Sequence, residues 1–181
     1  MAGIPMPPTS VTENTDQALK IIDDYKEAVL KPLYSTKARG MRVIRHGREA
    51  HIEVENFKKE NPIMYIQKKL DIHGRDLGIV FLGGEYITTY ARCNDTASWN
   101  TTTVNGGKYV AYDPSAETIE IARKAQALFD LDFTSVDVVE TPDGPLVFEV
   151  SAFGGFKGMK IARNMDGAKH YVDYVLKRIA P

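Results

Sequence analysis

The sequence predicts an α+β protein built mainly from antiparallel strands. The first observation is a pair of β-branched, apolar segments on either side of Thr141-Pro142-Asp143-Gly144, whose residue types favour a tight turn. The second is a similar pair, residues 77–82 and 85–92, joined by Gly83-Gly84. Because hairpins outnumber helical crossovers along the chain, antiparallel sheet is expected. A length of 181 residues suits one large domain or two small lobes.

The first half of the chain is expected to contain a helix, short strands and one polar loop. Asn14-x-x-Gln17 is a capping-box pattern, and an apolar stripe of helical spacing follows it. Residues 49–60 permit either a helix or a strand. Short strands are predicted at residues 28–30, 41–45 and 63–70, and a polar loop at residues 34–40.

The second half contains the two hairpins and two further helices. Residues 93–107 are polar and lack periodicity, and a loop of this length is usually functional or disordered. A helix is expected after Asp113, with Asp113 as N-cap and Pro114 in the first turn. A glycine-rich turn at residues 153–156 precedes the last helix, which follows Asp166.

The composition is that of an ordinary globular protein and excludes several classes. It is 43% apolar and 26% charged, with a net charge of −1, so we expect no nucleic-acid partner. We expect no membrane partner, because no apolar run approaches a membrane span. The single cysteine, Cys93, rules out an internal disulfide framework and favours a reducing compartment, here the cytoplasm. Cys93 itself is expected to be a bystander, not a nucleophile.

The hairpin around Asp143 brings two acids together. If the strands fold symmetrically about Asp143, Asp137 lies opposite Glu149, with Cβ atoms roughly 5 Å apart on one face. Two carboxylates so placed repel each other unless a cation lies between them, and Mg²⁺ prefers such oxygen ligands. The alternative is a bend or bulge that points one acid into water.

Other residues are weaker candidates when taken singly. Lys31 ends a strand before the loop from Ser35 to Gly40, so it could meet a phosphate or simply be solvated. The strand end from Gln67 to Leu70 could offer backbone groups to an adenine or be an ordinary edge. Asp76 and Arg92 flank the second hairpin and could form a structural ion pair instead of a site. The four histidines show no metal-ligand spacing.

Taken in order, these segments resemble a known family. VLKP, IQKKL, GRDLGIVFLGGEYITTYAR, WNTTTVNGGKYVAYDP, FTSVDVVE and PLVFEVS together are similar to the ATP-grasp superfamily, and within it to RimK-like alpha-L-glutamate ligases, from Gly3 to Ile179. The resemblance implies a first lobe at residues 1–66, a second at 67–181, and ATP bound between them. It implies an ATP-dependent carboxylate–amine ligase that forms an acyl-phosphate and adds glutamate to a carboxylate, either a protein C-terminus or a coenzyme.

The resemblance also implies roles for individual residues. Arg92 would face the transferred phosphate as the catalytic residue, and Lys31 would contact the α- and β-phosphates. The metal ligands would be Asp137, Glu149 and Ser151, with Glu149 bridging two Mg²⁺ ions; Mn²⁺ is the alternative ion. The remaining residues implied to bind ATP lie in the phosphate loop, the adenine strand, the ribose side and the WNTTT segment: Ser35, Thr36, Gly40, Gln67, Lys68, Lys69, Leu70, Asp76, Asn100, Thr101 and Thr102.

Several positions depart from the family pattern. The third metal position is usually asparagine in E-V-N and here is Ser151; the arginine of D-I-R is Gly78; and FRSN is replaced by residues 100–102. The phosphate loop has fewer glycines, and residues 151–156 differ from N-x-x-P-G. These departures keep two alternatives open: a ligase that uses another amino acid, and a nucleotide-binding module without turnover.

Family members carry a further N-terminal domain of roughly a hundred residues before the point where this sequence starts. That domain supplies part of the acceptor site, so we expect the isolated chain to have little ligase activity. The sequence also permits a homo-oligomer.

Overall fold

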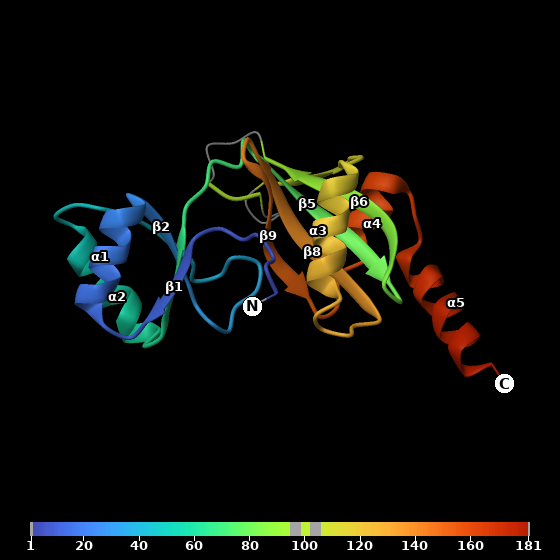
Figure 1. The fold of residues 1–181 in the computed structure, drawn as a ribbon, viewed down its shortest axis with the longest axis horizontal. Helices are drawn as coiled ribbons and strands as arrows, with labels where there is room; N and C mark the ends of the chain where they lie inside the picture. Colours follow the sequence, from blue (N-terminus) through green and yellow to red (C-terminus); the bar gives the residue numbers. More distant parts are fainter. Residues whose placement is uncertain (1, 95–98, 102–105, 181) are drawn as a thin grey trace. The chain divides into compact units, whose positions relative to one another are not determined.

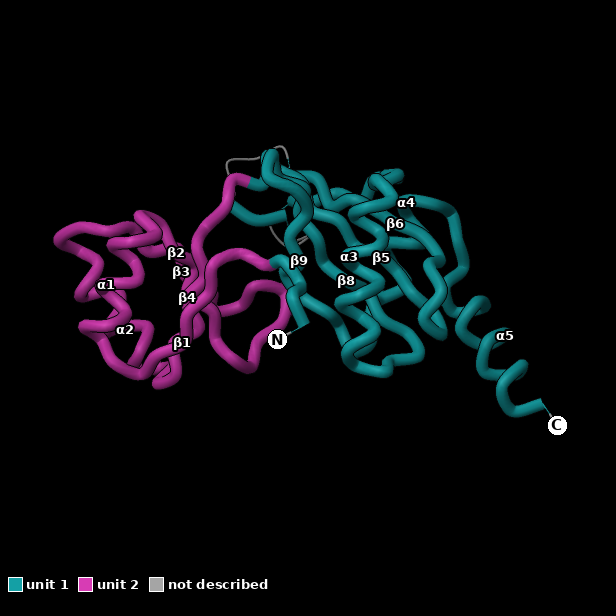
Figure 2. Tube along the Cα trace, viewed as in Figure 1, with its two compact units in different colours: residues 1–5, 72–181 teal, residues 6–71 magenta. Residues whose placement is uncertain are grey.

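The computed structural model describes residues 2–94, 99–101 and 106–180, and these form two compact units (Figure 2). Unit 1 contains Met1–Pro5 and Ile72–Pro181, and unit 2 contains Met6–Asp71. Within the described residues, every strand pairing is antiparallel. The predicted α+β class with mainly antiparallel sheet is therefore confirmed.

Unit 2 is a four-stranded sheet covered by two helices (Figure 1). In the described part of the chain its strand order is β1-β4-β2-β3. Buried residues of both helices and three strands form one core, led by Ile22, Leu30, Val54, Phe57 and Ile66. The elements are β1 (Thr9–Thr12), α1 (Thr15–Tyr25), β2 (Glu27–Lys31), β3 (Arg42–Arg45), α2 (Ala50–Glu60) and β4 (Met64–Lys68).

Local sequence explains both helices of unit 2. The Asn14 side chain accepts a hydrogen bond from the backbone N–H of Gln17, which confirms the predicted N-cap of α1. The segment at residues 49–60, for which the sequence permits either a helix or a strand, forms helix α2. Its residues Ala50, Val54 and Phe57 lie on one helical face and are all buried. Strand β1 was not predicted.

Unit 2 extends five residues beyond the predicted lobe boundary after residue 66. Gln67 and Lys68 still belong to β4, and Gln67 is paired with Thr9 on one side and Val29 on the other. The backbone N–H of Lys69 also donates to the carbonyl of Glu27 in β2. These pairings hold the segment in the smaller sheet.

Unit 1 is a five-stranded sheet with helices on both faces (Figure 1). Its strand order over the described residues is β7-β6-β5-β8-β9. Helix α3 packs on one face over Leu77, Ile79 and Val136, whereas α4 and α5 pack near one end of the other face, over Val80 and Phe133. The elements are β5 (Arg75–Leu82), β6 (Glu85–Cys93), β7 (Lys108–Ala111), α3 (Ala116–Gln126), β8 (Phe133–Thr141), β9 (Gly144–Ser151), α4 (Lys157–Arg163) and α5 (Gly167–Ile179).

Three features of unit 1 differ from the sequence-based expectation. Strand β7 and helix α4 were not predicted. The predicted N-cap at Asp113 is wrong: Ser115 caps α3 by accepting a hydrogen bond from the backbone N–H of Thr118. Asp113 lies two residues before this cap, and its carboxylate forms an ion pair with Arg163 of α4.

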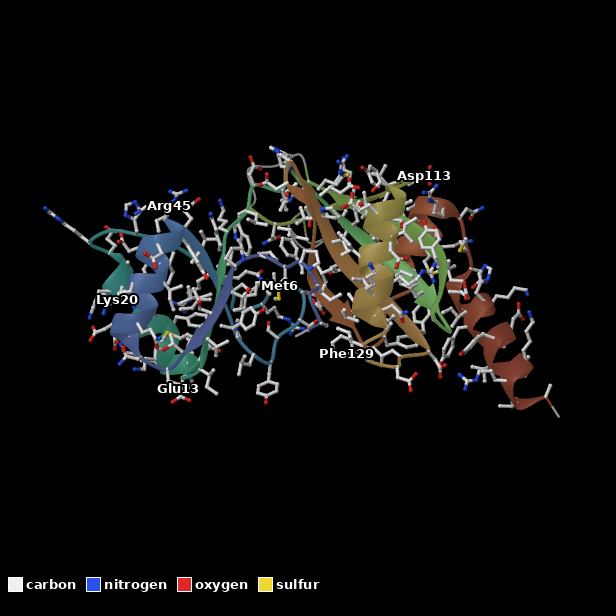
Figure 3. All side chains as sticks on the ribbon, in the orientation of Figure 1. Met6, Glu13, Lys20, Arg45, Asp113 and Phe129 are labelled. Atoms are coloured by element: carbon white, nitrogen blue, oxygen red, sulfur yellow. The ribbon has the colours of Figure 1, made fainter. Side chains whose placement is uncertain are left out.

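The surface carries charges of both signs. Glu13, Lys20 and Arg45 project from unit 2 and are exposed (Figure 3). Among residues 2–94, 99–101 and 106–180, no helix combines the length and apolarity needed to cross a lipid bilayer.

Candidate functional site

The predicted pairing of Asp137 with Glu149 is confirmed, but a bulge produces it. The turn pairs Thr141 with Gly144 and continues to Val138 opposite Val147. An unbroken ladder would then place Phe148 opposite Asp137. The register shifts at this point, so that Glu149 takes the position instead. Because strand side chains alternate between faces, the bulge is what brings Glu149 to the face that carries Asp137.

The second hairpin contains an equivalent shift. Leu82 pairs with Glu85 and Phe81 with Tyr86, which would place Ala91 opposite Asp76. A shift beyond Phe81 pairs Asp76 with Arg92 instead. Both bulges therefore move a charged residue onto the same face of the sheet, as bulges near active sites often do.

Arg92 lies between two aspartates on this face. Its Nε donates to the two oxygens of Asp76 at 3.2 and 3.0 Å, and its Nη2 contacts Asp76 and also Asp137 Oδ2, the latter at 2.7 Å. The exposed fractions of the side chains are 18% for Arg92, 7% for Asp76 and 18% for Asp137. The Asp76–Arg92 ion pair considered in the sequence analysis is thus present, and Asp137 extends it.

Burial and charge set the protonation of this group. Burial raises the pKa of Asp137 to about 6, although the neighbouring Arg92 acts in the opposite direction. Burial lowers the pKa of Arg92, but the charges of Asp137 and Asp76 outweigh it and hold that pKa well above its ordinary value. The guanidinium is therefore a permanent cation beside a carboxyl whose pKa is raised by burial.

Gly78 lies in the middle of the same face and makes room for Tyr90. Gly78 pairs with Tyr90 on β6 and with Asp137 on β8. A Cβ at residue 78 would lie 2.4 Å from Tyr90 Cζ, so the phenol ring crosses the glycine toward the aspartate's strand. Gly158 of α4 gives the ring similar room on its other edge. Tyr90 was not among the predicted site residues, although counting pairs along the hairpin places it near residue 78.

Ser151 adds a hydroxyl to the acidic pair. Its Oγ donates to Glu149 Oε1 at 3.2 Å, and both residues lie on the side of β9 that carries the site. Over the described chain, no group of three or more His, Cys, Asp and Glu side chains is arranged to hold a metal ion. A metal here would rely on two carboxylates and the serine hydroxyl.

The WNTTT segment reaches this cluster through Thr101. The Thr101 hydroxyl donates to Asp76 Oδ1, and Thr101 is 6% exposed. The carbonyl of Asn100 accepts a hydrogen bond of 2.8 Å from the Asn94 side chain. Thr102 lies outside the described residues.

In unit 2, Lys31 is held by a neighbouring amide. Its Nζ donates to Gln67 Oε1 at 2.6 Å, and Gln67 Nε2 donates to Thr9 Oγ1 at 3.1 Å. The Gln67 side chain therefore points to Lys31, and Gln67 is 3% exposed.

The predicted phosphate loop folds back on itself. The Ser35 hydroxyl donates to the carbonyl of Arg39 at 2.5 Å, and Gly40 has the positive φ of +71° that favours glycine. The loop and the end of α2 border a depression of roughly 690 Å³. It is lined by Pro32, Tyr34, Ser35, Thr36, Arg39, Gly40, Glu60 and Asn61.

The predicted adenine strand is partly engaged within unit 2. The backbone N–H of Lys68 donates to the carbonyl of Pro8, and that of Lys69 donates to the carbonyl of Glu27. Lys69 Nζ also pairs with Glu27 Oε2 at 3.1 Å. Hence a base that binds here through a backbone N–H would have to use a residue beyond Lys69, beginning with Leu70.

Comparison with known proteins supports one family. Residues 1–175 match the RimK-like ATP-grasp domain. The tetrahydromethanopterin:alpha-L-glutamate ligase of Methanococcus maripaludis is 28% identical over 178 residues, covering 96% of this chain and 60% of the relative. A probable alpha-L-glutamate ligase of Legionella pneumophila is 26% identical, covering 99% of this chain and 60% of the relative. The chain thus spans less than two thirds of these relatives.

Solved structures agree on the fold. The ATP-grasp ligase PsnB, complexed with a phosphomimetic variant of its minimal precursor, Mg and ADP, matches with a TM-score of 0.79 at 20% identity, covering 98% of this chain and 54% of PsnB. The D-cycloserine synthetase DcsG matches with a TM-score of 0.76 at 20% identity, covering 99% of this chain and 67% of DcsG. The predicted ATP-grasp fold is confirmed, and the chain belongs to the RimK-like ATP-grasp domain family.

Proposed function

We propose that this chain is the ATP-binding part of a carboxylate–amine ligase that acts through an acyl-phosphate. The observation that carries the proposal is the cluster on one face of the larger sheet. There Asp137 and Glu149 oppose each other, and the Arg92 guanidinium lies 2.7 Å from Asp137. Such a site offers oxygen ligands for a divalent cation, and its guanidinium would face phosphoryl oxygens once its contacts with the aspartates loosen.

The residues fit Mg²⁺ chemically. Asp137, Glu149 and Ser151 offer two carboxylates and a hydroxyl, which are ligands that a hard cation accepts together with phosphate oxygens. Bound Mg²⁺ would neutralise charge on the phosphates. A second Mg²⁺ bridged by Glu149, or Mn²⁺ in place of Mg²⁺, belongs to the same proposal.

Unit 2 would supply the other ATP contacts. Lys31 would meet the α- and β-phosphates, and the loop with Ser35, Thr36 and Gly40 would cover them. The segment from Gln67 through Lys68 and Lys69 to Leu70 would lie beside adenine. In unit 1, Asn100, Thr101 and Thr102 would lie near the nucleotide. Asp76 is the proposed ribose-side acid, and its bonds to Arg92 would have to loosen for that contact.

The reaction consists of two substitutions. A carboxylate oxygen of the acceptor attacks the γ-phosphorus of ATP, and ADP leaves with the electrons of the broken P–O bond. A neutral amine then attacks the acyl carbon, inorganic phosphate leaves, and the amine loses a proton. The protein contributes positioning and charge neutralisation, without a nucleophile of its own. Arg92 would stabilise the charge on the transferred phosphoryl group.

Glutamate is the proposed amine, and the acceptor is a protein C-terminus or a coenzyme carboxylate. The names of the alpha-L-glutamate ligase relatives support glutamate, and a structure of PsnB complexed with its precursor peptide PsnA2 supports a peptide acceptor. A cytoplasmic location is part of the proposal, on the basis of the single cysteine.

The test measures ADP release by the full-length protein with candidate acceptors and each of several amino acids. Glutamate-dependent release that is lost in Glu149→Gln supports the proposal, whereas equal release with another amino acid points to a different amine.

Ser151→Asn should raise Mg²⁺ affinity if the serine is a ligand. Unchanged affinity would remove Ser151 from the site.

A nucleotide-binding module without turnover is the second candidate. Two departures from the family pattern favour it. Ser151 is a weaker ligand than the asparagine that is usual at the proposed third metal position. Gly78 replaces an arginine, and the neutral ring of Tyr90 lies over it, so the site has one positive charge fewer. Calorimetry separates the two functions. Mg²⁺-dependent ATP binding without phosphate release, with every carboxylate offered, would identify the module.

A further inference from the structure

We propose that Gln67 is a positioning residue that holds the Lys31 ammonium, and that Thr9 fixes the orientation of the Gln67 amide. Each of the three residues comes from a different strand of the smaller sheet, β4, β2 and β1. The effect on nucleotide binding rests on the proposed function, but the positioning itself does not.

The sheet register brings the three side chains together. Gln67 lies directly opposite Thr9 on one side and Val29 on the other, and Lys31 is two residues beyond Val29 on the same face. Diagonal neighbours of this kind lie within reach of long side chains. The opposite face carries Leu30 and Ile66, which pack under the helices. The polar chain is therefore separated from the core by the sheet itself.

The hydrogen bonds determine which way the amide faces. The Thr9 hydroxyl has one proton, and it donates that proton to the carbonyl of Pro7 at 2.7 Å. Toward Gln67 it can only accept, so the amide NH₂ lies against Thr9 at 3.1 Å. The amide oxygen must then face Lys31, where it accepts at 2.6 Å. The reverse orientation would set the amide NH₂ against the ammonium, two donors together.

This arrangement prepares Lys31 for an anion. A lysine side chain has many rotamers, and ordering it before binding reduces the entropy lost when a phosphate arrives. Because Gln67 is neutral, it orders the ammonium without cancelling its charge. A glutamate at the same position would compete with the phosphate for that charge.

The first experiment uses the ligand-free protein and NMR relaxation of the Lys31 ε-methylene, assigned by its loss in Lys31→Arg. We expect an ordered side chain in the wild type and a mobile one in both Gln67→Leu and Thr9→Val. The matched control is Ser10→Ala, the neighbouring hydroxyl of β1, which contacts Tyr25 instead. In the Ser10→Ala variant, the Lys31 side chain should remain ordered. Unchanged order in both folded test variants would overturn the proposal.

The second experiment is a double-mutant cycle read by the dissociation constant of Mg-ADP. Gln67→Leu should weaken binding about tenfold in the wild type, and twofold or less in a Lys31→Met background. Equal losses in both backgrounds would mean that Gln67 affects binding by a route other than Lys31, and would overturn the inference. If the wild type does not bind Mg-ADP, the proposed function fails, and the relaxation experiment alone decides whether Gln67 positions Lys31.

Discussion

Replacing Arg92 with methionine should destabilise the protein in a pH-dependent way. The substitution keeps most of the side-chain volume but removes the guanidinium that lies between Asp76 and Asp137. Both carboxylates are largely buried, with exposed fractions of 7% and 18%. Removing one partner of such a group leaves charge uncompensated, which costs about 3–5 kcal/mol of unfolding free energy near neutral pH.

The pH dependence follows from Asp137. Its pKa in the folded wild type is about 6, above the ordinary value of 3.8, so its contribution to stability is full below pH 3.8 and is lost as the pH rises through 6. Without the cation, that pKa should rise further, because Arg92 opposes the effect of burial. The variant then keeps losing stability above pH 6, where the wild type no longer does. Each pH unit by which the pKa rises adds about 1.4 kcal/mol to the loss at high pH, so the loss should be larger at pH 7.5 than at pH 5.

The assay is urea unfolding at pH 5 and pH 7.5, followed by circular dichroism with a common m-value. Arg75→Met is the matched control on the adjacent strand β5, because Arg75 is 44% exposed and lies 3.7 Å from Glu140. It should cost about 1 kcal/mol or less. A loss below 1 kcal/mol for Arg92→Met, or an equal loss at both pH values, would refute the reasoning.

Three further predictions concern single residues. Gly78→Ala should cost about 2 kcal/mol in urea unfolding, because its Cβ would lie 2.4 Å from Tyr90 Cζ and force the ring to move; a neutral result would mean that the ring has other room. Glu149→Gln should abolish Mg²⁺-dependent turnover but leave unfolding of the metal-free protein within about 1 kcal/mol of wild type, since Glu149 is exposed, the glutamine oxygen can still accept from Ser151, and the charge that repels Asp137 is removed. Glu27 has its pKa lowered by a hydrogen bond from Arg45, so its contribution is present above pH 4.5 and lost as the pH falls through the lower folded value. Glu27→Gln should therefore show a shallower fall of melting temperature between pH 5 and pH 3, and parallel curves would contradict the assignment.

Much of the architecture could be predicted because its signals are local. Asn14 caps α1 through its own side chain, and the turns at Gly83-Gly84 and Pro142-Asp143 close their hairpins where turn residues occur. Helix α2 remained ambiguous because Ile52-Glu53-Val54 also suits a strand. Burial of Val54 and Phe57 against the sheet of unit 2 decided for the helix. The predicted N-cap at Asp113 was wrong because the helix begins two residues later, where the Ser115 side chain supplies the cap.

The sequence by itself determined which charged residues the hairpins carry, and that Asp137 and Glu149 could oppose each other. Tertiary structure decided which face each of them occupies. Two register shifts, beyond Phe81 and beyond Val138, turn Arg92 and Glu149 toward Asp76 and Asp137. A shift of one residue reverses the face of every later side chain, and its energy depends on packing across strands and not on the turn alone. The acids and the arginine can therefore be identified from the sequence, whereas the folded sheet brings them into one cluster.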